Sequence, residues 1–99
     1  MLNKFPDKIQ YISKDVEVDK FGYRKNEAVE KTVRYVGGQD VYISNGDNSG
    51  TEYRLIFHCP FEVKVEDKFI YKGHEMSVKK SEEVRDIFYK TIHWRVEVV

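Results

Sequence analysis

The feature that most restricts the fold of this chain is a strict two-residue alternation in residues 51–59. Large apolar side chains recur at every second position, and mostly charged or polar side chains stand between them. A period of two is that of a β-strand with one buried face. Pro60 ends this strand, because proline cannot donate to a strand ladder. The side chains expected in the core are Tyr53, Leu55, Phe57 and Cys59.

A second alternation covers residues 91–99, and it predicts a last strand with Ile92, Trp94 and Val96 facing the core. Residues 8–18 and 28–36 and the short piece 41–43 are weaker strand candidates. Residues 69–71 and 75–78 flank a tight hairpin signal built on Gly73. Residues 81–89 fit either one helical turn or a wide connection.

The residue types agree with a fold made of strands. Val, Ile, Thr, Tyr, Phe and Trp account for 37 of the 99 residues, whereas Ala, Leu and Met account for 5. Branched and aromatic side chains suit a pleated surface, while the second group favours helices. We therefore predict an all-β fold, a small antiparallel barrel or sandwich of five to six strands with a long flexible loop.

The length of 99 residues leads us to expect a single domain spanning 1–99. With 17 basic and 17 acidic residues, the chain lacks the basic excess of a general nucleic-acid binder. Cys59 is the only cysteine, so an internal disulfide is impossible. No apolar run approaches the roughly 20 residues of a membrane helix, and we expect a soluble, unexported protein.

The sequence offers little support for an enzyme or a metal centre, and we expect no catalytic residue, cofactor or metal. His58 and Cys59 are adjacent, so on a strand they point to opposite faces, away from a shared metal ion. The carboxylate pairs Glu66-Asp67 and Glu82-Glu83 lie in charged segments that we interpret as solvated surface. A small oligonucleotide-binding barrel, with Tyr23 and Tyr42 as exposed rings, is the alternative from another class.

The segment most in need of explanation is residues 37–50, which contain Asp40 and Asp47 and no Lys or Arg. A weakly structured connection of this length in a small domain is either functional or simply a solvated loop. Its members are Gly37, Gly38, Gln39, Asp40, Val41, Tyr42, Ile43, Ser44, Asn45, Gly46, Asp47, Asn48, Ser49 and Gly50.

Three short segments resemble the head-completion proteins of long-tailed bacteriophages, also called head-closure, stopper or head–tail joining proteins. The first is the Phe21-Gly22 turn after the leading strand. The second is the hairpin of residues 65–78, and the third is the final strand of residues 92–99, which stops at the C-terminus. The resemblance spans nearly the whole chain. The sequence departs from many relatives in its charged N-terminal strand and in the composition of residues 37–50.

The resemblance implies a virion protein, assembled in the cytoplasm of a bacterial host. It would form a homo-oligomeric ring that closes the DNA exit channel after packaging and docks the tail. Its partners would be the adaptor or portal proteins on the head side and tail-completion or tail-tube proteins on the tail side. DNA would pass through the lumen without specific binding, and residues 37–50 would be the channel loop. A tail-completion or minor capsid protein remains an alternative at this level.

Overall fold

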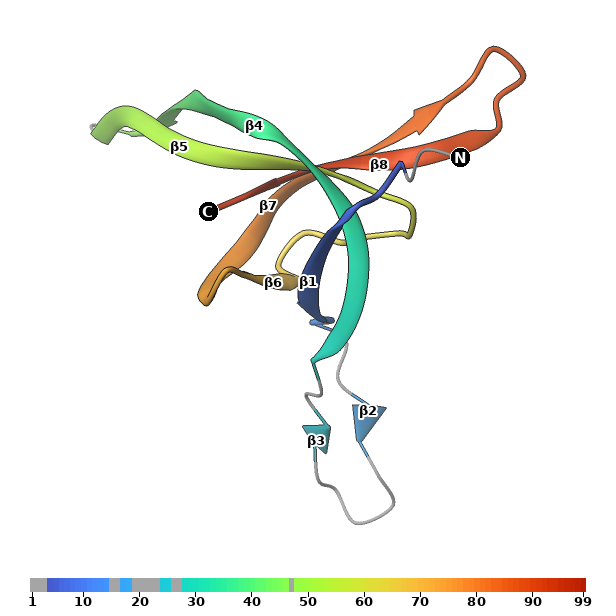
Figure 1. Cartoon of the computed structure of the whole chain (residues 1–99). Helices are drawn as coiled ribbons and strands as arrows, with labels where there is room; N and C mark the ends of the chain where they lie inside the picture. Colours follow the sequence, from blue (N-terminus) through green and yellow to red (C-terminus); the bar gives the residue numbers. More distant parts are fainter. Residues whose placement is uncertain (1–3, 15–16, 19–23, 26–27, 47) are drawn as a thin grey trace.

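Strand-forming residues make a closed antiparallel barrel of six strands, in the order β1-β4-β5-β8-β7-β6 (Figure 1). The computed structural model describes residues 4–14, 17–18, 24–25, 28–46 and 48–99. The barrel strands are β1 (Asp7–Ile12), β4 (Val29–Asn45), β5 (Asn48–Cys59), β6 (Lys68–Tyr71), β7 (His74–Arg85) and β8 (Thr91–Val98). A separate two-stranded sheet pairs β2 (Glu17–Val18) with β3 (Arg24–Lys25).

The predicted all-β barrel is confirmed, and no residue in the described ranges is helical. The option of a helical turn in residues 81–89 is therefore wrong. β7 continues to Arg85, and residues 86–90 form a tight turn into β8. The predicted Phe21-Gly22 turn lies outside the described residues.

Two local predictions are confirmed by the strand boundaries. β5 ends at Cys59, directly before Pro60. Lys72 and Gly73 join β6 to β7 with φ values of 50° and 81°. Two successive positive φ angles are typical of the two-residue turn that matches the twist of a hairpin.

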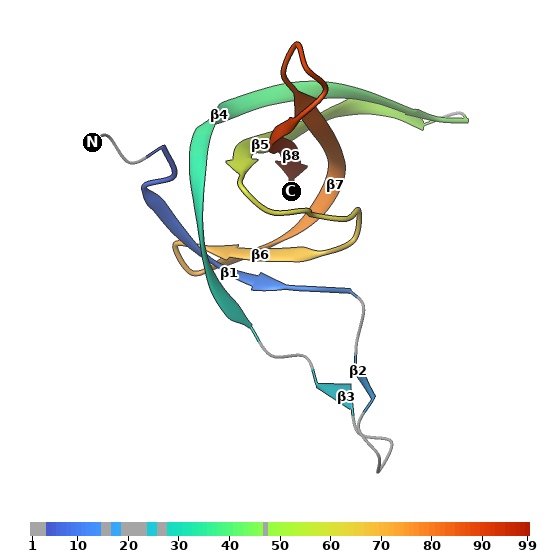
Figure 2. The ribbon, with the colours of Figure 1, turned by 90° about the vertical axis from the view of Figure 1, so that its right-hand side faces the viewer.

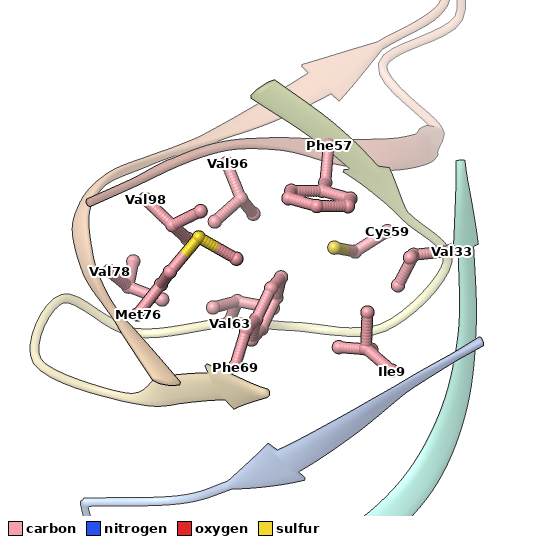
Figure 3. Close-up of a cluster of buried hydrophobic side chains, with 10 residues drawn as sticks. All are labelled: Ile9, Val33, Phe57, Cys59, Val63, Phe69, Met76, Val78, Val96 and Val98. Carbon is pink, nitrogen blue, oxygen red and sulfur yellow. The ribbon is translucent and has the colours of Figure 1, made fainter. Parts of the chain in front are cut away.

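The interior of the barrel is filled by side chains from all six strands and from the β5–β6 connection (Figure 3). Phe57 and Phe69 meet edge to face near its centre, with ring centroids 5.6 Å apart. Phe57, Cys59 and Val96 are fully buried, as the alternation predicts, and Leu55 and Trp94 pack against this cluster while remaining partly exposed. The buried members are Ile9, Val33, Phe57, Cys59, Val63, Phe69, Met76, Val78, Val96 and Val98.

Three β-bulges shift the alternation of the strands. The register places Val36 of β4, Lys79 of β7 and Ile92 of β8 as the extra residue between successive cross-strand pairs. A bulge changes which face the neighbouring side chains occupy. The core prediction for Ile92 is wrong for this reason, since its side chain is 53% exposed.

The core prediction for Tyr53 is also wrong, although its face is assigned correctly. Tyr53 shares a face with Leu55 and Phe57, but it lies beyond the last residue pair that β5 makes with β8. At that point the strand has left the barrel, and 60% of the Tyr53 surface is exposed.

The connection between β5 and β6 is held by a buried carboxylate. Asp67 is fully buried and accepts hydrogen bonds from Tyr11 Oη, from the amide of Lys14 at 2.8 Å and from the amide of Lys64 at 2.9 Å. Its own backbone carbonyl accepts from the Val78 amide at 2.8 Å. The prediction of a solvated Glu66-Asp67 pair is therefore wrong for Asp67, which joins β1, β7 and this connection.

Candidate assembly surfaces

Besides the β2–β3 pair, two hairpins extend beyond the barrel, and Figure 1 shows them on opposite sides of it. The first is formed by β4 and β5. β1 pairs with β4 only as far as Val33, and β8 pairs with β5 only from Leu55 onward. Residues 39–45 therefore pair only with residues 48–54, and we call residues 36–46 and 48–54 the β4–β5 arm.

The prediction of a long flexible loop over residues 37–50 is wrong. Residues 37–45 belong to β4 and residues 48–50 to β5, with a continuous ladder from Gly37 opposite Ile56 to Asn45 opposite Asn48. Backbone pairing across the hairpin compensates for the weak strand preference of its Gly, Asn and Ser residues. Gly46 adopts φ 59° at the turn, and Asp47 lies outside the described residues.

The face of the arm that continues from the barrel interior presents two exposed rings. Tyr42 and Tyr53 are 69% and 60% exposed. Tyr53 lies across the backbone of Gly38, because a Cβ atom placed on Gly38 would be 2.1 Å from the phenol oxygen of Tyr53. Only glycine at position 38 allows this close approach of the Tyr53 ring. Figure 2 shows the ribbon of the arm extending beyond the barrel.

Ion pairs fix the base of the arm to the barrel. Arg54 binds Glu52 at 2.9 Å and Glu97 at 3.3 Å, and Arg95 binds Glu97 at 2.8 Å. Glu97 is 2% exposed, and these two guanidinium groups balance its charge. The hydrogen bond to Glu52 is the main cause that raises the pKa of Arg54. Asp40, one residue pair beyond Arg54 toward the turn, has no such partner among the described residues, so the arm carries its unpaired carboxylate.

The second hairpin, between β7 and β8, ends in three exposed apolar residues that we call the apolar tip. Ile87, Phe88 and Tyr89 are 85%, 75% and 81% exposed. The Asp86 carboxylate accepts hydrogen bonds from the amides of Phe88 at 2.8 Å and Lys90 at 3.0 Å. Tyr89 adopts φ 61°, a backbone conformation that costs free energy for residues other than glycine. The turn therefore holds three large side chains in water in a fixed arrangement.

The apolar tip is a feature that the sequence reasoning missed. The run Ile87-Phe88-Tyr89 is visible in the sequence, but the sequence analysis treats residues 81–89 only as a helical turn or a wide connection. The signal that could have identified it is Asp86, since Asp favours turns by accepting hydrogen bonds from amides two or more residues later.

The described residues contain no group of three or more His, Cys, Asp or Glu side chains placed to hold a metal ion. The thiol of Cys59 is buried, and burial raises its pKa to about 12, so it stays protonated near neutral pH. No helix in the described part of the chain is long and apolar enough to cross a membrane.

Comparison with known proteins adds a likeness of fold. No family model matches the chain, and no curated protein matches it. Among solved structures, the phage-like element PBSX protein xkdH from Bacillus subtilis is similar, with a TM-score of 0.51 and 16% sequence identity. The match covers 94% of this chain and 91% of xkdH. The two chains share a fold.

Proposed function

We propose that this chain is a structural protein of a phage or phage-like particle, and that it forms a ring at the head–tail interface. In that position it would close the DNA exit channel after packaging and dock the tail. The observation that carries this proposal is a closed barrel with two unlike projecting hairpins, in a fold shared with a protein of a phage-like element.

The two hairpins support a ring rather than a symmetric dimer. The β4–β5 arm is a ribbon with two exposed tyrosines and a negative charge, whereas the apolar tip presents only large hydrophobic side chains. They leave the barrel on opposite sides (Figure 1). A ring is built from heterologous contacts that close when the rotation between subunits closes, and in a ring every subunit can present one of these unlike surfaces to the lumen and the other to a neighbouring protein.

The β4–β5 arm is the part of the chain that we place at the lumen. Asp40 would then be repeated around the ring axis, once in each subunit. A collar of carboxylates repels DNA phosphates, so DNA can move past it without adhering. The paired strands of the arm replace our expected flexible loop, so any opening would move the arm as a ribbon.

The apolar tip is the surface that we assign to a neighbouring protein. Three large side chains held at 75–85% exposure are available to enter a pocket on an adaptor, portal or tail protein. Buried aromatic anchors dominate the energy of many interfaces, and an anchor that is already ordered loses little entropy on binding. The five-residue turn fixed by Asp86 provides that order.

A second candidate function has one observation in its favour. Tyr42 and Tyr53 are exposed on the same face of the arm, and exposed rings are where small barrels stack single-stranded bases. The same face carries Asp40, which repels the backbone of a nucleic acid. We therefore retain oligonucleotide binding only as an alternative.

The test is a deletion of the gene, complemented from a plasmid, in a host that produces the particles. We expect the deletion to yield DNA-filled heads without tails, and heads that lose DNA on storage. Complementation by a chain lacking residues 45–49 should restore tails but not DNA retention. Normal tailed and filled particles in the deletion strain would refute the proposal.

The apolar tip can be tested in the same strain. Phe88→Ser should impair tail attachment, while Val65→Ser removes a large apolar side chain that is 46% exposed elsewhere on the barrel and should have no effect. Equal effects of the two variants would remove the apolar tip from the mechanism. Salt-dependent binding of a short single-stranded oligonucleotide by the isolated chain would instead favour the second candidate.

A further inference from the structure

A row of basic side chains crosses the outer wall of the barrel on three adjacent strands. Arg34 of β4 is paired with His58 of β5, and His58 is paired with Arg95 of β8. Directly paired residues of antiparallel strands project to the same face. That face is the outer one, because the neighbours of His58 along β5, Phe57 and Cys59, are buried in the core.

His93 joins this row from β8. It precedes Arg95 by two residues and therefore shares its face, and its ring lies 4.2 Å from the ring of His58, centroid to centroid, with 32° between the planes. Both imidazoles are only partly exposed. We call Arg34, His58 and His93 the basic cluster.

Within the described ranges of the chain, no carboxylate forms an ion pair with the basic cluster. Arg95 directs its guanidinium to Glu97 at 2.8 Å, and Glu82, which is paired with Arg95 in β7, binds Lys80 at 2.9 Å. Val84 of β7 is paired with His93 and brings no charge. The side chain of Arg34 makes no ion pair or hydrogen bond within the described part of the chain. Its five N–H donors are available to a ligand.

The surroundings of His58 show that positive charge accumulates at this position. Burial lowers the pKa of His58, and the positive charges of His93, Arg95 and Arg34 lower it further. In the empty cluster, the neutral form of the His58 imidazole is therefore favoured. A bound anion would act in the opposite direction, because it would stabilise the protonated rings and attract Arg34.

We propose that the basic cluster is a binding site for a phosphate group, either a free phosphate or the backbone phosphate of a nucleic acid. One Arg fork and two imidazolium N–H groups, on three strands about 4.8 Å apart, approach a ligand from several directions. A tetrahedral phosphate offers oxygens in these directions. A carboxylate has two oxygens in one plane, and a single Arg guanidinium can bind both of them. The site lies on the barrel wall and does not depend on the roles proposed for the β4–β5 arm and the apolar tip.

The test is a titration of the imidazole Cε1 protons of the full chain by NMR, in sodium chloride and in sodium phosphate at equal ionic strength. We expect saturating phosphate to raise the pKa of His58 by about one unit, which corresponds to about tenfold tighter binding of phosphate to the protonated site. Arg34→Gln should abolish this shift and weaken phosphate binding about tenfold. Lys72→Gln removes the same charge from the β6–β7 turn and should change binding less than twofold.

A short single-stranded oligonucleotide and a poly-glutamate peptide distinguish the sources of the anion. A rise in the His58 pKa with phosphate but not with the oligonucleotide identifies a free phosphate as the ligand. A rise with both shows that the site also binds the backbone of a nucleic acid. A larger shift with poly-glutamate than with phosphate would overturn the assignment in favour of an acidic protein. The absence of any shift, or equal losses in Arg34→Gln and Lys72→Gln, would refute the site.

Discussion

Removal of the buried carboxylate of Asp67 should strongly destabilise the barrel. Asp67→Ala leaves three donors without their acceptor, namely Tyr11 Oη–H and the amides of Lys14 and Lys64. An unsatisfied buried donor costs about 1–3 kcal/mol. Because Lys14 and Lys64 lie at an exposed edge, where water can replace part of the loss, we expect a total of about 3–5 kcal/mol.

Urea unfolding followed by the fluorescence of Trp94, the single tryptophan, measures this loss directly. A loss of this size should lower the midpoint of thermal unfolding by about 15–30 °C in a domain of this length. Glu66→Gln is the matched control, since Glu66 is the exposed neighbour and should contribute less than about 0.5 kcal/mol.

A double-mutant cycle with Tyr11→Phe measures the coupling between the Tyr11 hydroxyl and the Asp67 carboxylate. In the parent chain, loss of the Tyr11 hydroxyl should cost about 1–2 kcal/mol, because the carboxylate loses a donor. In the Asp67→Ala background that cost should largely disappear, since the acceptor is already gone. Additive effects, or equal small losses in Asp67→Ala and Glu66→Gln, would show that Asp67 does not organise this connection.

Four further predictions test other parts of the structure. Cys59 should react with a thiol reagent only after unfolding, because burial raises its pKa to about 12. Gly38→Ala should displace the Tyr53 ring and change its NMR shifts while the barrel stays folded. Trp94→Ala should destabilise the domain by about 3 kcal/mol, as its side chain is only partly buried. The pKa of His58 is lowered in the folded chain, so the unfolded chain binds more protons at this residue. In chloride buffer, the free energy of unfolding should therefore fall as the pH drops below about 6.5. Urea unfolding should show a less steep fall in His58→Gln.

The strands that could be predicted from the sequence are those whose signals are local. The alternation of residues 51–59, the stop at Pro60 and the turn at Lys72 and Gly73 each depend on a few adjacent residues. The β4–β5 arm could not be predicted in this way. Its glycines, asparagines and serines have little strand preference, and the hairpin forms because two segments pair along their whole length.

The candidate surfaces required knowledge of the register. Ile92 lies outside the core because a bulge adds one residue to β8, and a pattern of period two contains no sign of where a bulge occurs. The pairing of Arg34 with His58 joins residues far apart in the chain, and only the strand order brings them together. Asp67 looked like part of a solvated pair for the same reason, since two of its donors, Tyr11 in β1 and Lys14 just after β1, lie far from it in the chain.

Because β4 is continuous, a force on the end of the arm acts directly on the barrel. β4 runs without interruption from Val29, beside β1, to Asn45 at the end of the arm. The bulge between Tyr35 and Gly37 is the point at which the ladder is broken, and Gly37 there adopts φ 142°. A load applied at the end of the arm is therefore transmitted as torque about this bulge, and it reaches the barrel through β1 on one side and β8 on the other.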